Sequence, residues 1–496
     1  MPKKANVTKV ISKAESYIQN TADIHPEVHA ILTSLLGVLN ILTTAKVKKN
    51  STNSNIPSSQ NPLGFTALSN DEDNESSQDS DASTKPEKRK PGGQKGHKGS
   101  NLSPLSDPDE IVNLSVDELK KLPGVSYYEG GYEERQVFEM TVERKVIAYR
   151  AQVLVGSDDS LIKADFPDHV TERTQYGASV KAHALYMIFC QMLPYNRVRD
   201  HFVNNFGIHI SLGTLVNFGK VAYMALEPFE AYAKKMLLEG EVLHVDETGI
   251  NIKGFLMWMH SASNDRFVLQ IPHAKRGNEA TQDMDILPHF KGLLVHDNWA
   301  SYFAYACVHV LCNAHQIREL QLIIDEENYT WAKNMQALLR EICHEVNETE
   351  AGYLDIKRQE DFLRRYREIL RNADQEMPPP KTSFKKNGEL KKRTAQPKAR
   401  VLMNRLMALE EETLRFMKDP LAPFTNNEAE RCVRMVKVHQ KVAGCFRSFG
   451  GAEVFCRMRS YILSTMKHGI KPIDALNLLA QATYPTPFLP ALQSAC

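Results

Sequence analysis

Two short apolar runs that each end in an aspartate constrain the fold of this chain most strongly. The first is Val242–Asp246 (VLHVD) and the second is Leu293–Asp297 (LLVHD). Apolar runs of this length are typical of buried β-strands. A third acidic motif, Asn426–Arg431 (NNEAER), lies far downstream. Two carboxylates at strand ends and a third at a helix start could hold a pair of Mg²⁺ ions against a phosphodiester.

The residues around the two aspartates predict a particular order of elements. We expect strands at 241–246, 250–260 and 266–271, a helix over 277–287 and a strand at 292–297. Three strands, a helix and a further strand form the order of an RNase H-like fold, an α/β core with a mixed sheet. Both aspartates would then lie at carboxyl ends of strands, where open α/β sheets place their ligands.

The alternative for each aspartate is an ordinary turn or helix cap. That explanation suffices for one strand-ending aspartate, but it does not account for two in an order that fits the fold. We therefore predict Asp246 and Asp297 as metal ligands. Glu247 should point to the opposite face of the strand, because side chains alternate, and is a weaker candidate.

The third acid must be chosen between two glutamates in the first turn of a predicted helix. Thr425 and Glu428 fit a capping box, which gives Glu428 a structural role, and the same spacing recurs one frame later. Helical spacing places Glu430, Arg434 and Lys437 on one face. A metal-binding acid followed by cations suits a DNA phosphate, so we predict Glu430.

Composition divides the rest of the chain. Residues 49–104 have few large apolar side chains, which is typical of a disordered linker. The predicted parts are an N-terminal helical oligomerisation segment (1–48), a disordered linker with a basic Pro-Gly-Gly arm (49–104), a small β-rich module (105–170), a helical domain (171–238), an α/β catalytic core in two parts (239–300 and 421–475), a large helical insertion (301–420) and a C-terminal tail (476–496).

Within 171–238, two predicted helices flank a turn that contains Gly207. Ser211 precedes the second helix as a predicted cap. This pattern fits a helix-turn-helix that binds DNA, but taken alone it more often indicates an ordinary αα-hairpin.

Net charge is only +1, so the overall balance predicts no nucleic-acid partner. The distribution is less even, because an acidic run at 71–81 is followed by basic residues that include Lys88, Arg89 and Lys90. These cations could lie along DNA and release its counterions. A solubilising linker is the alternative, and we favour DNA contact.

The setting predicted from the sequence is reducing, cytoplasmic and free of membrane. The 8 cysteines are scattered and no secretory signal precedes them. The uncharged stretch Val28–Thr44 is less apolar and shorter than the roughly 20 residues of a membrane span. Its apolar spacing favours an oligomerisation helix instead.

Cys307–His315 (CVHVLCNAH) contains soft metal ligands at suggestive spacing. Cys312 and His315 could contribute to a structural zinc site. The alternative is a buried cluster in which His309 and His315 are hydrogen-bonded, and from the sequence we favour this second explanation.

Many short strings together match one known family. They are Lys90–Gln94 with Gly96–His97, Leu243–Thr248, Trp258–His260, Lys275–Gly277, Val295–Trp299, Leu311–His315, Arg318–Leu320, Asn426–Arg431, Lys441–Ser448 and Arg459–Tyr461. On these strings the chain resembles the large catalytic subunit of insertion sequence 66 family transposases, which have a DDE-type RNase H-like core.

The resemblance implies that Asp246, Asp297 and Glu430 form a catalytic triad that holds Mg²⁺ or Mn²⁺, with two ions expected. It implies that Lys437 is the basic residue seven positions after the glutamate, and Arg434 and Arg447 would join it on DNA phosphate. The expected activity is hydrolysis at element ends followed by strand transfer into target DNA.

The resemblance also implies partners and a location. The chain would act on DNA as a homo-oligomer in a bacterial, nucleoid-associated setting, beside two small accessory proteins of the same element. A zinc-binding module found in the family is not expected here, since residues 101–170 contain no cysteine. Two rival functions remain: a metal-dependent nuclease without strand transfer, and a DNA-binding regulator with a decayed core.

Overall fold

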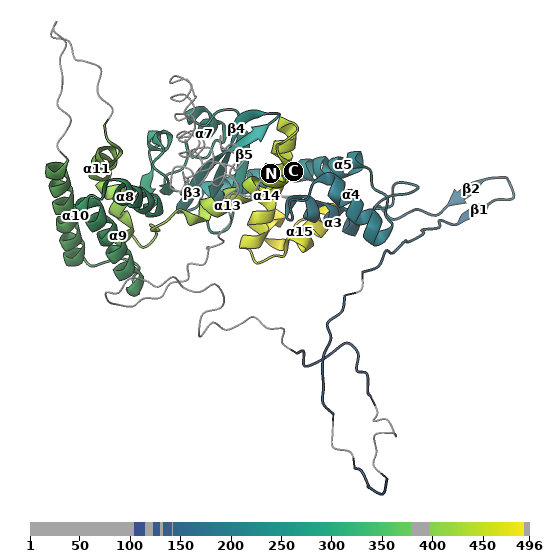
Figure 1. Ribbon diagram of the computed structural model, residues 1–496. Helices are drawn as coiled ribbons and strands as arrows, with labels where there is room; N and C mark the ends of the chain where they lie inside the picture. The colour runs from purple at the N-terminus through teal and green to yellow at the C-terminus, as the bar shows by residue number, and fades with distance from the viewer. Residues whose placement is uncertain (1–103, 115–122, 129–131, 141, 378–395, 491–496) are drawn as a thin grey trace, which may run out of the picture. The chain divides into compact units, whose positions relative to one another are not determined.

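The computed structural model describes residues 104–114, 123–128, 132–140, 142–377 and 396–490 (Figure 1). These residues fall into two compact units, one within 67–164 and a larger one that continues from Asp165. The predicted N-terminal helix, the linker and the basic residues Lys88, Arg89 and Lys90 lie outside the described residues.

The described residues of the smaller unit contain one hairpin. Strands β1 (Val153–Val155) and β2 (Leu161–Lys163) pair antiparallel. They are the only strands among the described residues of the predicted β-rich module, 105–170, and all their side chains are exposed.

The larger unit is built on a mixed five-stranded sheet in the order β5-β4-β3-β6-β7. Its strands are β3 (Val242–Ile252), β4 (Phe255–Ser263), β5 (Val268–His273), β6 (Leu293–His296) and β7 (Val308–Leu311). Neighbours β3, β4 and β5 are antiparallel, whereas β6 and β7 run parallel to β3 and to each other. A short helix, α7 (Asn278–Asp283), lies in the crossover from β5 to β6.

Three predicted details of this sheet are wrong. Strand β3 continues past Asp246 to Ile252, so Asp246 lies inside a strand and not at its end. The strand predicted at 250–260 is the end of β3, a turn and β4. Lys253 and Gly254 make that turn with φ of 53° and 90°, as a two-residue hairpin turn requires. Strand β7 was missed, because 301–420 was expected to be mostly helical.

Alternate residues of β3 and β6 face two apolar cores. Leu243, Val245 and Leu294 belong to one core, and Leu293 and Val295 to the other. Helix α13 (Asn427–Ala443) packs on β3, and helix α14 (Phe449–Lys467) packs on β5. Residues close to the C-terminus therefore cover strands that precede them by almost 200 positions.

Among the described residues, four helices precede the sheet. They are α3 (Ala178–Phe189), α4 (Tyr195–Phe206), α5 (Leu212–Ala225) and α6 (Glu227–Leu238). Gly207 ends α4 with a φ of 61°, and the Ser211 hydroxyl caps α5 by accepting from the Thr214 N–H at 3.0 Å. The glycine turn and the serine cap predicted from the sequence are both present.

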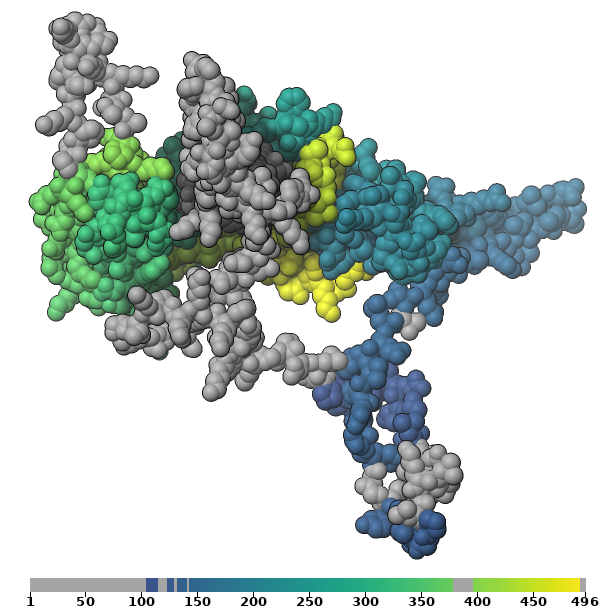
Figure 2. All heavy atoms as spheres, in the orientation of Figure 1, coloured from purple at the N-terminus to yellow at the C-terminus, as the bar shows by residue number. Residues whose placement is uncertain are grey.

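The remaining α-helices of the described residues are one group of five and the single helix α15. One group packs around the second core and appears in green in Figure 2: α8 (Asn313–Glu327), α9 (Thr330–Glu348), α10 (Ile356–Glu376), α11 (Lys398–Ala408) and α12 (Glu410–Leu414). At the end of the chain, α15 (Pro472–Ala480) packs on α3. The predicted tail, 476–496, thus includes the end of a packed helix and the buried Phe488.

A search of the described helices finds none with the length and apolar character that crossing a bilayer would need.

Candidate active site

Asp246 and Asp297 are brought together by the parallel pairing of β3 with β6. The paired residues end with His244 and Val295, and each aspartate follows two residues later, close enough for the charge of Asp297 to raise the pKa of Asp246. Both side chains therefore project from the same face of the sheet. Asp297 follows β6 directly, as predicted, although Asp246 does not end its strand.

Both carboxyl groups are shifted towards the protonated form. Burial raises the pKa of Asp246 well above its usual value, and the charges of Glu247 and Asp297 raise it further. Burial, again with Glu247, raises the pKa of Asp297 to about 6. The Trp299 N–H opposes this shift by donating to Asp297 Oδ1 at 3.0 Å. Two buried carboxylates that repel each other form a site that a cation would stabilise.

Glu247 lies on the other face of β3, as side-chain alternation predicts. Its side chain is only 1% exposed and pairs with Arg276, whose Nη2 lies 2.7 Å from Oε1. The Tyr302 hydroxyl donates to the other carboxylate oxygen. Arg276 is stacked between two indoles, with its guanidinium carbon 3.7 Å from the ring centre of Trp299 and 4.8 Å from that of Trp258. Glu247 is thus engaged within the fold beneath the aspartates.

Helix α13 places the third acid, and Asn426 holds the start of that helix. The Asn426 side chain donates to the Val245 carbonyl at 2.8 Å and accepts from His244 Nδ1 at 2.9 Å. Glu430, one turn later, is close enough for its charge to contribute to the raised pKa of Asp246. Segments separated by more than a hundred residues therefore meet.

Glu428 points elsewhere and forms an ion pair with Lys467 of α14. The capping box predicted for Thr425 and Glu428 is absent, since Asn426 is the N-cap and no side chain caps the helix. Of the two glutamates, Glu428 therefore pairs with α14, whereas the charge of Glu430 acts on Asp246.

The three predicted cations of this region differ in their surroundings. Lys437 Nζ donates to the Gly249 carbonyl at 2.7 Å. Burial lowers its pKa, and the charge of Asp246 opposes that effect, so Lys437 lies near the aspartate. Arg434 and Arg447 are exposed, on α13 and in the loop that follows it.

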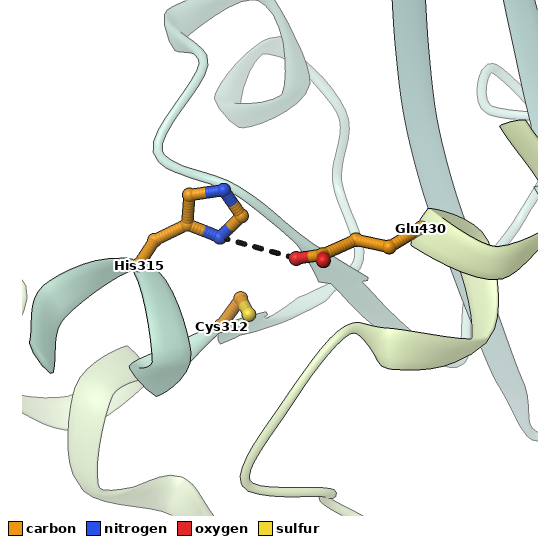
Figure 3. A group of neighbouring side chains, drawn as sticks. All are labelled: Cys312, His315 and Glu430. Carbon is orange, nitrogen blue, oxygen red and sulfur yellow. Dashed lines mark ion pairs between the residues drawn. The ribbon is translucent and has the colours of Figure 1, made fainter. Parts of the chain in front are cut away.

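Cys312 and His315 approach Glu430 from the first turn of α8 (Figure 3). The three potential ligand atoms lie within 4.8 Å of one another. Arg318 Nη2 also donates to Glu430 Oε1, at 3.2 Å. Burial raises the pKa of the Cys312 thiol and lowers that of His315.

From the sequence we favoured a buried cluster in which both His309 and His315 are hydrogen-bonded. The structure shows side-chain hydrogen bonds for His309, whereas His315 Nδ1 has none. His309 pairs with His296 at 3.0 Å and with the Tyr305 carbonyl at 3.1 Å. His315 Nδ1 is buried without a hydrogen bond, 3.6 Å from Glu430 Oε1.

Sequence reasoning overlooked Arg276 and Asn426 as parts of the site. Both lie in strings that had been singled out, Lys275–Gly277 and Asn426–Arg431, but nothing local in those strings indicates a long-range partner. The available signal was the position of Arg276 in the sequence, between the two strings that contain Trp258 and Trp299.

Comparison with known proteins gives one family. A sequence model described as "Transposase IS66 family" matches residues 173–454, more than half of the chain. That span includes both aspartates, Glu430 and the helices between them. A search of curated proteins finds no match.

Proposed function

The chain belongs to the IS66 family of transposases, and from this membership together with the site we propose that it is a DDE-type DNA transposase. The observation that carries the proposal is the shared face of Asp246 and Asp297, which meets the first turn of α13 with Glu430. The sheet order, with three antiparallel strands followed by two parallel ones, supports an RNase H-like core.

We propose Asp246, Asp297 and Glu430 as the ligands of a divalent metal centre of two ions. Oxygen ligands of this kind suit Mg²⁺ or Mn²⁺. Asp246 accepts the Glu247 N–H and forms no ion pair among the described residues, so its carboxyl group is available to a cation. Bound metal would supply Lewis-acid activation of the attacking oxygen and stabilisation of the leaving one.

The chain's own residues would bind and orient the DNA around this centre. The reaction begins when water attacks the phosphodiester at the element's 3′ end and the P–O bond to the freed 3′ oxygen breaks. That 3′-hydroxyl then attacks a target phosphodiester, forming a new P–O bond and releasing a target 3′-hydroxyl. Lys437, Arg434 and Arg447 would offset phosphate charge during both steps.

DNA contacts would extend beyond the core. We propose α4 and α5 as a helix-turn-helix that binds DNA, and Lys88, Arg89 and Lys90 as a basic arm along it. The N-terminal segment, 1–48, would serve oligomerisation, and two small accessory proteins of the element are the proposed partners. The predicted division into modules is also part of this proposal, with two changes: the helical insertion begins after β7, which belongs to the core sheet, and α15 belongs to the packed fold and not to a tail.

The test is a strand-transfer assay with a labelled terminal DNA end and Mg²⁺ or Mn²⁺. Wild type should join the end to target DNA, whereas Asp246→Asn, Asp297→Asn and Glu430→Gln should each lose joining. Glu428→Gln is the matched control, since it removes a neighbouring carboxylate that pairs with Lys467. Full activity in any of the first three variants would refute that residue's role.

The same assay separates the rival functions. Cleaved but never joined ends would indicate a nuclease. Normal binding to element ends without cleavage by the wild-type protein would indicate a regulator.

A further inference from the structure

The group of Cys312, His315 and Glu430 contains ligands that differ chemically from those of the aspartate pair. A thiol, an imidazole and a carboxylate converge within 4.8 Å from the first turns of two helices (Figure 3). Thiolate and imidazole ligands select Zn²⁺ and similar ions, whereas Mg²⁺ prefers oxygen alone.

Two features of this group are compatible with a bound ion. Cys312 is only 1% exposed. Its Sγ accepts the Asn426 N–H at 3.1 Å, and such a bond suits a sulfur that carries negative charge. His315 Nδ1 is buried, lacks a hydrogen bond and faces Glu430 Oε1 at 3.6 Å. At 3.6 Å this contact is an ion pair and not a hydrogen bond; a buried ring nitrogen without a hydrogen bond is costly, and a metal ion between the imidazole and the carboxylate would satisfy it.

We propose that Cys312, His315 and Glu430 bind one Zn²⁺ ion at a regulatory site, and that this ion inhibits strand transfer by holding Glu430 away from Asp246 and Asp297. The inhibition rests on the proposed function, since it requires Glu430 to serve the catalytic centre, but zinc binding does not. A single carboxylate cannot complete both sites at once, so occupancy of one opposes occupancy of the other.

Arg318 must release Glu430 before an ion can bind there. Its Nη2 now holds Glu430 Oε1 at 3.2 Å, and its side chain is 45% exposed. An exposed arginine can turn into solvent when a cation replaces it, at the small cost of a surface ion pair. Three protein ligands leave a fourth tetrahedral position open to water, as in zinc sites that exchange their ligands.

The binding test uses Co²⁺ as a probe on the full-length protein after removal of metal by a chelator. Wild type should show a sulfur-to-cobalt charge-transfer band in the near ultraviolet, and Zn²⁺ should abolish it by displacement. Cys312→Ser should lose the band, while its hydroxyl can still accept the Asn426 N–H. His315→Gln, with Cys312 intact, should bind Co²⁺ more weakly. Cys307→Ser is the matched control and should retain the band, because Cys307 is also partly buried and near a histidine.

The inhibition test titrates Zn²⁺ into strand transfer at fixed Mg²⁺. Wild type and Cys307→Ser should lose joining at the same zinc concentration, and any residual joining by Cys312→Ser should resist it. Absence of a wild-type cobalt band, or its persistence in Cys312→Ser, would overturn the site. Equal zinc sensitivity in Cys312→Ser would place the inhibitory ion at the aspartates instead and overturn the regulatory role. A normal cobalt band in a protein that never joins DNA would count against the proposed function alone.

Discussion

The Asn426 side chain joins the start of α13 to Val245, the residue before Asp246. Its amide donates to the Val245 carbonyl at 2.8 Å and its oxygen accepts from His244 Nδ1 at 2.9 Å. Asn426 is 2% exposed, so water cannot replace these bonds. Because Glu430 lies one turn further along, this link positions the third acid relative to the first.

Replacement of Asn426 by alanine should therefore destabilise the protein and impair joining. Loss of the amide leaves the Val245 carbonyl and His244 without partners, which should lower the free energy of unfolding by about 1–3 kcal/mol. Asn426→Asp is the informative comparison, since it can still accept from His244 but cannot donate to Val245. Urea unfolding and strand transfer of both variants measure the two effects, and wild-type stability in Asn426→Ala would contradict the link.

Asp297→Asn should stabilise the metal-free protein above pH 6. The pKa of Asp297 rises from about 3.8 unfolded to about 6 folded, so the folded state binds more protons between these values. Stability is then greatest below pH 4 and falls as pH rises through about 6, by up to about 3 kcal/mol. The asparagine variant should lack this part of the pH dependence.

Thermal melting with a chelator, at pH 5 and pH 8, tests this expectation. Added Mg²⁺ should raise the melting temperature of wild type at pH 8 more than that of Asp297→Asn. A wild type that is stabilised by rising pH to the same degree as the variant would contradict the raised pKa.

Replacing each of the two glutamates of α13 should affect a different property, stability for Glu428 and metal binding for Glu430. Glu428→Gln loses a charge partner of the largely buried Lys467, so we expect a loss of about 1–3 kcal/mol in unfolding free energy. Its Mn²⁺ affinity, measured by electron paramagnetic resonance, should stay at the wild-type value. Glu430→Gln should show the reverse pattern, weak Mn²⁺ binding with small loss of stability. Matching profiles in the two variants would remove the distinction.

Local sequence patterns predicted most strands of the sheet but little of how distant segments contact one another. The apolar runs before Asp246 and Asp297 predicted two strands, β3 and β6. These strands pair in parallel, with Val242 opposite Leu293. The extension of β3 beyond Asp246 was missed because Thr248 and Gly249 interrupt the apolar pattern, while pairing with β4 keeps the strand extended. Strand β7 was missed because only four residues, Val308–Leu311, form it beside a long helical region.

Side-chain partners were harder to predict than strands. Alternation placed Glu247 on the opposite face of β3, but its partner Arg276 is 29 positions away in a loop. The meeting of Cys312 with Glu430 depends on where two helices start, and the sequence between them gives no spacing rule for that. Burial and partners of this kind depend on the tertiary fold.

The pair of Glu247 and Arg276 should behave as a unit in a double-mutant cycle. Arg276→Gln leaves the buried Glu247 carboxylate without its cation, and we expect a loss of about 3–5 kcal/mol in unfolding free energy. Adding Glu247→Gln removes the unpaired charge and should restore much of that stability, giving a coupling energy of about 1–3 kcal/mol. Arg276→Lys keeps the charge but loses the stacking between Trp258 and Trp299 and the paired approach of Nε and Nη2 to Glu247 Oε1. Its stability should therefore lie between those of wild type and Arg276→Gln. Urea unfolding of the four proteins of the cycle measures the coupling. Additive losses in the double variant would show that Arg276 stabilises the fold through its tryptophan contacts and not through Glu247.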